Sequence, residues 1–385
     1  MNNHFWKAAL CAAIVPFALA GCGGGDDGGA QTGTLHVAMT DAPSCGFDHI
    51  YVTVSQVRVN ANTNASDNDA GWSTITLATP RKIDLLSLTN GVLADIGQTA
   101  LPAGQYQQIR LVLAPNQGNS LANSVVPTGG TEQALATPSA TQSGYKIIQP
   151  FTVQANTLVD LVLDFNACKS IVQRGNGTYA LKPVVTAIPT VVSGAISGYV
   201  APAEAGATVY AEQGGKVVRG TVADSTGKFV LSPLIQSSTQ GNYDVVIVQN
   251  NFASGIVRTV PVVVNTTTAV SASNAPITLP ASTMSSISGT VTASADALVR
   301  ALQTVDARAY EITSINANMD TGAYALNVPT AAPIVGTYSG SLPVALAASP
   351  AAAAQYTIEA DAASGATQST NVNATTSQSN VNFSF

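Results

Sequence analysis

Apolar and polar residues alternate along much of this chain with the period of two that indicates β-strands. The clearest run spans residues 50–59, in which Ile50, Val52 and Val54 share one side of the strand. The phase of the alternation changes near Gln56, which predicts a β-bulge within this strand. A polar loop at residues 60–71 then precedes a return strand at residues 72–77. The pattern therefore predicts a β-hairpin with a long loop.

Shorter apolar runs of the same kind fill the rest of the first half of the sequence. Turn residues such as Leu101-Pro102-Ala103-Gly104 separate them, and a short helix is expected within residues 83–96. The remaining strands are expected at residues 35–39, 106–113, 145–148, 151–153, 157–165 and 179–188. Residues 34–190 are therefore predicted to form a β domain.

Two later segments repeat each other. Ile196-Ser197-Gly198 matches Ile287-Ser288-Gly289, and Tyr243 matches Tyr356. Between these pairs, residues 207–211 line up with residues 298–302, and the turn at residues 224–229 lines up with residues 320–324. The spacing then grows because of an Ala/Pro-rich insertion at residues 329–354. Each copy has the size and the turn spacing of one β-sandwich, with boundaries expected at residues 189–194 and 280–286.

The first residues of the chain have the three parts of a secretory signal. Lys7 precedes an apolar core at residues 8–20, and the tetrad Leu19-Ala20-Gly21-Cys22 follows. This tetrad resembles the bacterial lipobox, which implies that Cys22 is lipidated and that residues 1–21 are removed. Gly23 in place of Asp favours the outer membrane by the same resemblance. The alternative is an ordinary signal peptide with a chance cysteine.

Composition narrows the class of protein further. The chain has 385 residues, of which only 9% are charged, against about 25% in an ordinary soluble domain. Its net charge is −6, which excludes a nucleic-acid binder of the usual basic kind, and a coiled coil would need many more Glu and Lys residues. No stretch after residue 21 is apolar for the length of a transmembrane helix, and the Gly-rich residues 22–33 read as a flexible tether.

Four cysteines occur in the sequence. Cys11 leaves with the signal and Cys22 takes the lipid, which leaves Cys45 and Cys168. Two cysteines in an oxidising compartment most simply form a disulfide, which is worth about 4 kcal/mol for a loop of this length. The alternative is two buried thiols.

Few residues offer catalytic or metal-binding chemistry. His36 and His49 lie in strand patterns and are expected to be structural. Asp41 and Asp164 are weak candidates for a calcium site or a pair of catalytic acids, although turn capping is the favoured interpretation. Residues 67–69 resemble the start of a calcium loop, but the downstream Gly and Glu are missing, so a hairpin loop is expected. No catalytic residue, resident metal or cofactor is predicted.

The motifs resemble two known families. Residues 39–43, 101–106 and 163–172 carry a resemblance of residues 34–190 to the domain-of-unknown-function family 4382, found in bacterial lipoproteins, which implies no particular activity. Residues 191–283 and 284–385 each resemble the carboxypeptidase-regulatory-like domain, a transthyretin-type sandwich grouped with carbohydrate-binding-like folds. The second copy is degenerate, because its Gly-Ala pair and its final Gly are missing.

The fold class predicted is all-β, with tandem β-sandwich domains after a lipoprotein signal peptide and a flexible tether. The function expected is that of a lipid-anchored cell-envelope protein, on the periplasmic face or the surface of the outer membrane. There it would act as a non-catalytic structural or adhesion-type interaction module, with the membrane and an envelope protein or polysaccharide as partners. The alternatives are a carbohydrate-binding protein of the envelope and an enzyme that uses Asp41 and Asp164.

Overall fold

The computed structural model describes residues 31–385 apart from residues 42–45, 119, 237–240 and 293–296. Its described part is built almost entirely of β-strands arranged in several separate sheets, which confirms the predicted fold class. The predicted signal peptide, Cys22 and Cys45 lie outside the described residues.

The first sandwich contains two sheets, with strand orders β12-β9-β1-β4 and β10-β11-β7-β6-β2-β5-β8, and β3 pairs with β2. Its strands are β1 (Thr32–Asp41), β2 (Phe47–Asn60), β3 (Ser73–Asp84), β4 (Ala94–Pro102), β5 (Gly104–Leu113), β6 (Ser124–Pro127), β7 (Gln133–Ala136), β8 (Tyr145–Val153), β9 (Leu158–Phe165), β10 (Ile171–Gln173), β11 (Tyr179–Leu181) and β12 (Val185–Pro189). The helical turns are η1 (Leu85–Ser87), α1 (Pro138–Gln142) and α2 (Ala167–Ser170).

The alternation in the sequence explains the core of this sandwich. Ile50, Val52 and Val54 are fully buried in β2, and the register of β2 shifts between Val54 and Gln56, as a bulge requires. The expected short helix is the 3-10 turn η1, whose first turn is capped by Asp84 accepting a hydrogen bond from the Leu86 N–H at 3.2 Å.

The second and third sandwiches follow along the chain. The second contains β13 (Ser193–Tyr199), β14 (Thr208–Gln213), β15 (Lys216–Val222), β16 (Lys228–Ile235), β17 (Tyr243–Val248), β18 (Gly255–Val260) and β19 (Thr267–Ala269), with η2 (Thr190–Val192) before it and η3 (Pro202–Glu204) inside it. The third contains β20 (Met284–Thr292), β21 (Ala297–Val305), β22 (Arg308–Asn316), β23 (Ala323–Pro329), η4 (Pro350–Ala352), β26 (Gln355–Ala362), β27 (Thr367–Asn373) and β28 (Phe383–Ser384).

These two sandwiches have the same strand topology. In the second, β13 pairs antiparallel with β16 and parallel with β19, while β14 lies between β15 and β17. In the third, β20 pairs antiparallel with β23 and parallel with β28, while β21 lies between β22 and β26. The sequence repeat is therefore also a repeat of structure.

The insertion at residues 329–354 does not stay with the third sandwich. Its strand β24 (Ile334–Thr337) pairs parallel with β18, with Gly255 opposite Ile334, and β25 (Ala347–Ala348) pairs with β24. Both strands extend the larger sheet of the second sandwich, and Ile334 and Val344 join its core. In return, Val246 and Ile256 of the second sandwich pack in the core of the third.

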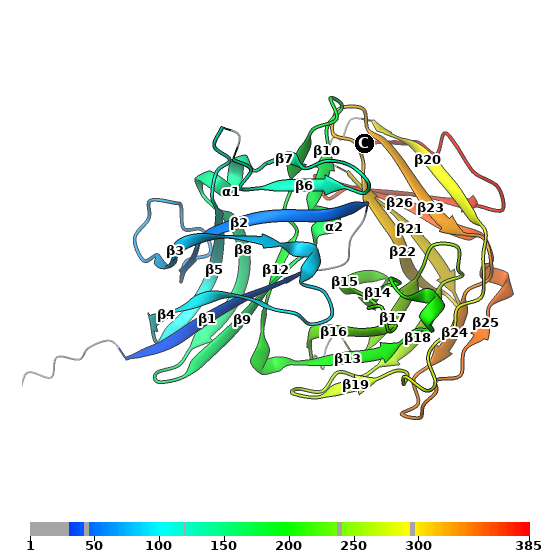
Figure 1. Ribbon diagram of the computed structural model, residues 1–385, viewed down its shortest axis with the longest axis horizontal. Coiled ribbons are helices and arrows are strands. Elements are labelled where there is room, and N and C mark those ends of the chain that lie inside the picture. The colour runs from blue at the N-terminus through cyan, green and yellow to red at the C-terminus, as the bar shows by residue number, and fades with distance from the viewer. Residues whose placement is uncertain (1–30, 42–45, 119, 237–240, 293–296) are drawn as a thin grey trace, which may run out of the picture.

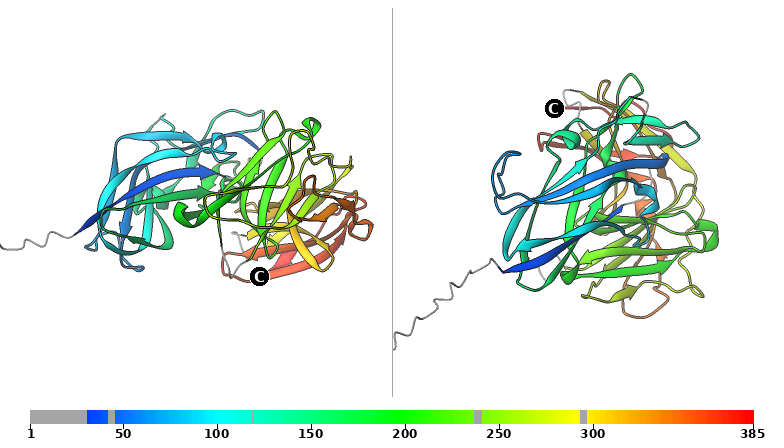
Figure 2. Two further views of the ribbon diagram at one scale, coloured as in Figure 1. Left: turned by 90° about the horizontal axis from the view of Figure 1, so that it is seen from below. Right: turned by 60° about the vertical axis from the view of Figure 1, so that its left-hand side comes forward.

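The three sandwiches pack against one another. The first lies at one end of the molecule, and the second and third pack side by side at the other (Figure 1, Figure 2). Hydrogen bonds join the first sandwich to both of the others: the Asn90 N–H donates to the Thr221 hydroxyl, and the Asn316 side-chain amide donates to the Lys169 carbonyl.

Candidate functional site

The two predicted acidic residues lie on neighbouring strands of the first sandwich. β1 and β9 pair in parallel, with Thr40 opposite Asp164 and Asp41 opposite Phe165. Both carboxyl groups are buried, and Oδ1 of Asp41 accepts a hydrogen bond from the Ala167 N–H at 2.9 Å. Asp41 therefore satisfies an N–H in the first turn of α2, whereas the local turn beside Pro43 that it was expected to cap falls outside the described residues.

The cation beside Asp164 is an arginine from the second sandwich. Nη2 of Arg219, in β15, lies 3.1 Å from Oδ2 of Asp164, and Arg219 is only 2% exposed. The pKa of Asp164 is raised, because burial outweighs the opposing effect of the Arg219 charge. The pKa of Arg219 is lowered, because burial outweighs the opposing effect of the Asp164 and Asp41 charges. The acidic pair thus forms part of a joint between two sandwiches.

A second ionic cluster joins all three sandwiches. Nζ of Lys169, at the end of α2, lies 2.9 Å from Oε1 of Glu311 in β22. The other oxygen of Glu311 lies 3.2 Å from Nη1 of Arg300, which also pairs with Glu359 and Asp361. Nη1 of Arg300 further donates to the carbonyl of Gly215 in the second sandwich at 3.3 Å.

Glu212 of β14 enters this cluster from the second sandwich. Its Oε2 accepts a hydrogen bond from the Glu311 N–H at 3.1 Å, and the residue is 1% exposed. Burial is the largest cause that raises the pKa of Glu212 well above 4.5, and the charge of Glu311 raises it further. Glu212 is therefore held toward its neutral form, whereas Glu311 faces two cations.

The sparse charge of the sequence is concentrated at these joints. Eight charged side chains of the described residues are buried, and six of them lie where sandwiches meet: Asp41, Asp164, Glu212, Arg219, Arg300 and Glu311. The last four are not among the candidate residues predicted from the sequence. A signal was present, because Arg219, Arg300 and Glu311 each interrupt an apolar strand pattern in a chain with few charges.

The two described histidines are hydrogen-bonded to carboxylates of the first sandwich. Nδ1 of His36 lies 2.7 Å from Asp160 and its Nε2 lies 3.0 Å from Asp95. Nδ1 of His49 lies 2.7 Å from Asp84, which is also the cap of η1. In the described part of the chain, neither ring is hydrogen-bonded to a hydroxyl or thiol that it could activate.

The residues that resembled a calcium loop lie in the β2–β3 connection. Asp67 pairs with Arg110, and Asp69 accepts a hydrogen bond from the Ser66 N–H at 2.8 Å. Trp72 closes the loop, since its indole donates to the Ser66 carbonyl and its ring lies 4.5 Å from the guanidinium carbon of Arg58. Across the described residues, no group of three or more His, Cys, Asp or Glu side chains is placed to hold a metal ion.

The predicted disulfide falls partly outside the described residues, because Cys45 is not among them. Cys168 lies in α2, and Gly46, the residue after Cys45, lines the same cavity as Cys168. The Cys45–Cys168 bond stays a prediction, as does lipidation of Cys22. Within the described ranges, no helix is both long and apolar enough to cross a membrane.

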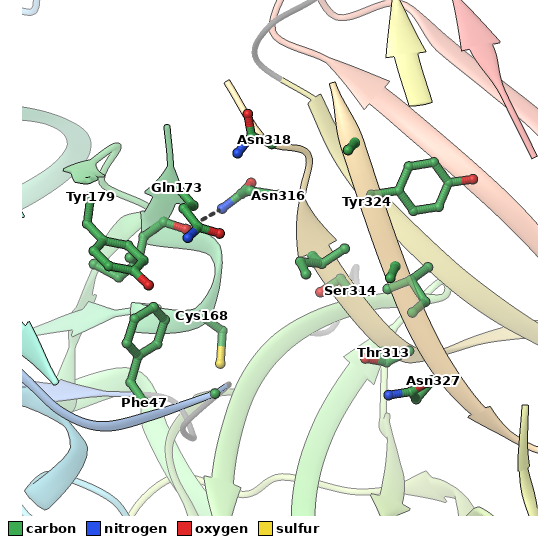
Figure 3. Close-up of a pocket in the computed structure, with 16 residues that line it drawn as sticks. Phe47, Cys168, Gln173, Tyr179, Thr313, Ser314, Asn316, Asn318, Tyr324 and Asn327 are labelled. Carbon is green, nitrogen blue, oxygen red and sulfur yellow. Dashed lines mark hydrogen bonds between the residues drawn. The ribbon is translucent and has the colours of Figure 1, made fainter. Parts of the chain in front are cut away.

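A cavity of about 740 Å³ lies between the first and third sandwiches. Figure 3 shows the rings of Phe47 and Tyr179 together on one side and the strands that carry Ser314 and Asn327 on the other. The described residues that line it are all uncharged. This cavity was not foreseen from the sequence, because its two walls come from segments more than a hundred residues apart.

Comparison with known families supports the sequence analysis for the first sandwich. Residues 32–183 match the model of the family described as "Domain of unknown function (DUF4382)", which confirms that resemblance. The comparisons indicate no catalytic family. No curated protein matches the sequence.

Comparison with solved structures finds pilin-type proteins at low similarity. A streptococcal ancillary pilin is 7% identical, with 92% of this chain and 99% of that chain covered and a TM-score of 0.17. The major pilin BcpA of Bacillus cereus (9% identical, TM-score 0.13) and the major pilin SpaA of Corynebacterium diphtheriae (10% identical, TM-score 0.17) have the same coverage. Likenesses at these scores carry no argument about this chain.

Proposed function

We propose that this protein is a lipid-anchored, non-catalytic structural or interaction module of the cell envelope, attached to the outer membrane through Cys22. The observation that supports this most is the pair of buried ionic joints, Arg219–Asp164 and Lys169–Glu311, between sandwiches. Breaking a buried ion pair costs about 3–5 kcal/mol, so such joints resist the relative motion that is usual between domains. Three sandwiches held as one body, after the tether predicted at residues 22–33, suit the presentation of a surface.

The placement of the reactive side chains also favours a non-catalytic role. Asp41 and Asp164 are buried and already hold a backbone N–H and an arginine, so they do not face a substrate. Both ring nitrogens of His36 contact carboxylates. A catalytic nucleophile needs a base within hydrogen-bonding reach, and no described histidine offers one.

The anchor is tested by producing the full-length chain and its Cys22→Ser variant in a Gram-negative bacterium fed a clickable fatty acid. The full-length chain is expected to take up label and to fractionate with the outer membrane, whereas the variant stays unlabelled. Protease added to intact cells then separates the surface from the periplasmic face. Equal labelling or equal fractionation of the two chains overturns the lipid anchor.

The fixed arrangement of the sandwiches is tested by limited proteolysis of the purified full-length protein. The connection at η2 is expected to resist cleavage, and the Arg219→Thr variant, which loses the ionic joint, is expected to be cut there several times faster. Rapid cleavage of the unaltered protein at this connection would contradict a single rigid body.

The second candidate function is carbohydrate binding, and one observation favours it. The cavity between the first and third sandwiches has an uncharged lining, as far as its residues are described, and combines aromatic rings with hydroxyl and amide side chains. A glycan array probed with the full-length protein in detergent tests this function, and the absence of any bound glycan by a folded protein would remove it.

A further inference from the structure

We infer that the cavity between the first and third sandwiches is a binding subsite for a short, neutral oligosaccharide. This inference rests on the second proposed function and assigns it to particular residues. The cavity has a volume of about 740 Å³, which lies within the roughly 300–1,000 Å³ of small-molecule sites. It is therefore large enough for a ligand of a few sugar rings.

One wall of the cavity is aromatic. Phe47, at the start of β2, and Tyr179, at the start of β11, meet edge to face with ring centroids 5.6 Å apart and an interplanar angle of 77°. Both side chains are half-buried, so each is held in place yet keeps surface open to the cavity. Aromatic rings of this kind suit the C–H face of a sugar, because they offer apolar area that is already ordered.

The opposite wall offers hydrogen-bonding groups. Thr313 and Ser314 of β22 and Asn327 of β23 line it, and their side chains make no hydrogen bond to another described residue. Hydroxyl groups both donate and accept, and an amide offers two donors and an acceptor. The same pattern of donors and acceptors is what the vicinal hydroxyls of a sugar require.

The absence of charge from the described lining selects a neutral ligand. Two ionic groups on segments that adjoin the lining are already engaged, since Lys169 pairs with Glu311 at 2.9 Å and Asp320 accepts from the Gly175 N–H at 2.6 Å. A phosphate, carboxylate or cationic ligand would lose its hydration in this cavity without gaining an opposite charge. An uncharged polyhydroxyl ligand has no such cost.

The walls are held in position by direct bonds between the two sandwiches. Nδ2 of Asn316 donates to the carbonyls of Lys169 and Ile171, and the Met319 N–H donates to the Gln173 carbonyl at 3.0 Å. The cavity is thus formed before a ligand arrives, which avoids much of the ordering cost of binding. Preformation is expected of a site rather than of a loose gap between domains.

The test starts from a glycan array with full-length protein and then measures the affinity of the best neutral hit for single variants. Tyr179→Ala and Asn327→Ala are each expected to weaken binding about tenfold, as the loss of one stacking or hydrogen-bonding contact implies. Tyr51→Ala, which removes another half-buried tyrosine of the first sandwich away from the cavity, is the matched control and should leave affinity unchanged.

Two outcomes overturn the inference, and they differ from each other. If no neutral glycan binds, carbohydrate binding itself fails. If a glycan binds but Tyr179→Ala and Asn327→Ala leave its affinity unchanged, carbohydrate binding stands and this cavity is not its site. Tyr179→Phe, which keeps the ring, guards against a folding defect: it should retain most of the affinity and the melting temperature of the unaltered protein.

Discussion

The second and third sandwiches repeat the residues that hold their own fold. The hydroxyl of Tyr243 donates to the carbonyl of Ile235 at 2.9 Å, and that of Tyr356 donates to the carbonyl of Pro329 at 2.6 Å, so the same tyrosine ties the same strand end in both. The repeated tyrosine therefore makes the same hydrogen bond within each sandwich.

The two sandwiches differ where each meets a neighbour. In the register of the paired strands, Ala211 lies opposite Arg219 in the second sandwich, and Ala301 lies opposite Thr313 in the third. Arg219 is buried against Asp164 of the first sandwich, whereas Thr313 lines the cavity. The two sandwiches therefore share the same strand pairing but differ at this position. The second carries an arginine that forms an ionic joint, and the third carries a threonine that lines a cavity.

The largest effect is expected from making the second sandwich like the third at this position. Arg219→Thr leaves the buried carboxyl of Asp164 without its cation, which should lower the free energy of unfolding by about 3–5 kcal/mol. Without Arg219, the pKa of Asp164 rises further, because the arginine is what lowers it. The loss should therefore grow as pH rises from the folded pKa of Asp164 in the unaltered protein toward its higher pKa in the variant, and chemical denaturation at several pH values measures it.

The double variant Arg219→Thr/Asp164→Asn is the control for this prediction. It removes the uncompensated charge along with the pair, so most of the lost stability is expected to return. If Arg219→Thr alone is tolerated with no change in stability, the joint is not an energetic tie between the sandwiches.

The next largest effect tests the turn that both sandwiches share. Gly227 (φ +79°) and Gly322 (φ +67°) each leave no room for a Cβ, which would lie 2.2 and 2.1 Å from the carbonyl oxygens of Val200 and Val291. Gly227→Ala and Gly322→Ala should each cost about 2–4 kcal/mol, from left-handed backbone and overpacking together.

Gly214→Ala separates these two causes. Gly214 has a similar backbone (φ +59°) but open space around it, so only the conformational cost of about 1–2 kcal/mol is expected. Calorimetry of the three variants provides the comparison. A cost for Gly322→Ala no greater than that for Gly214→Ala would show that the turn of the third sandwich is not packed as that of the second.

Much of the fold could be predicted because strand alternation and turn residues are local signals. The bulge near Gln56 and the repeated Tyr243 and Tyr356 were read directly from the pattern, and the structure confirms the bulge and gives both tyrosines the same hydrogen bond. The burial of Ile50, Val52 and Val54 follows from the same period of two.

The repeat alignment was wrong in detail, for a structural reason. The match of Asp224 with Asp320 rests on residue type, but the structural equivalent of Asp224 is Asn318. The Asp224 N–H donates to the Lys228 carbonyl, and the Asn318 N–H donates to the Ala323 carbonyl in the same way. Each of these two side chains also accepts a hydrogen bond from an N–H group of its turn. Asp320 instead contacts Gly175 of the first sandwich.

The Ala207 match was likewise one residue off. The Ala223 N–H donates to the Ala207 carbonyl, and the Ala317 N–H donates to the Ala297 carbonyl, so Ala207 corresponds to Ala297 rather than to Leu298. Of the Gly-Ala pair, the third sandwich has therefore kept the alanine and lost only the glycine.

The joints and the exchanged strand could not be read from the sequence. β24 lies in what the sequence shows only as an Ala/Pro-rich insertion, and its partner β18 belongs to the other copy. Likewise, nothing near Arg219 or Lys169 in the sequence identifies Asp164 or Glu311 as a partner. Contacts between sandwiches depend on how whole domains pack, which periodicity within one strand does not encode.

A stabilising change is expected at Glu212, whose counterpart after the shared bulge is Leu302 in the third sandwich. Because burial raises the folded pKa of Glu212 above its ordinary value of 4.5, the protein binds this proton more tightly than the unfolded chain does. The stability that Glu212 contributes is then present at low pH and is lost as pH rises from about 4.5 toward the folded pKa.

Glu212→Gln keeps an acceptor for the Glu311 N–H but carries no titrating charge. It should match the unaltered protein near pH 4 and exceed it at neutral pH, by about 1.4 kcal/mol for each unit by which the pKa is raised. Urea titrations at both pH values measure this. A variant that is less stable than the unaltered protein at neutral pH would show that Glu212 is ionised and favourably paired in the folded state.

The smallest effect concerns the two tyrosines and tests how far the sandwiches are equivalent. Tyr243→Phe and Tyr356→Phe each remove one buried hydroxyl and leave the ring in place, so each should cost about 1 kcal/mol, the usual net worth of such a hydrogen bond. Because both hydroxyls bond the carbonyl at the end of the matching strand, β16 or β23, the two losses should be equal within error and should add in the double variant. Thermal unfolding of the two single variants and the double variant measures this. A loss confined to Tyr243→Phe would mean that Tyr356 is conserved in the degenerate copy without contributing the same hydrogen-bond energy. A double variant far from additive would mean that the two hydroxyls are energetically coupled across the sandwiches.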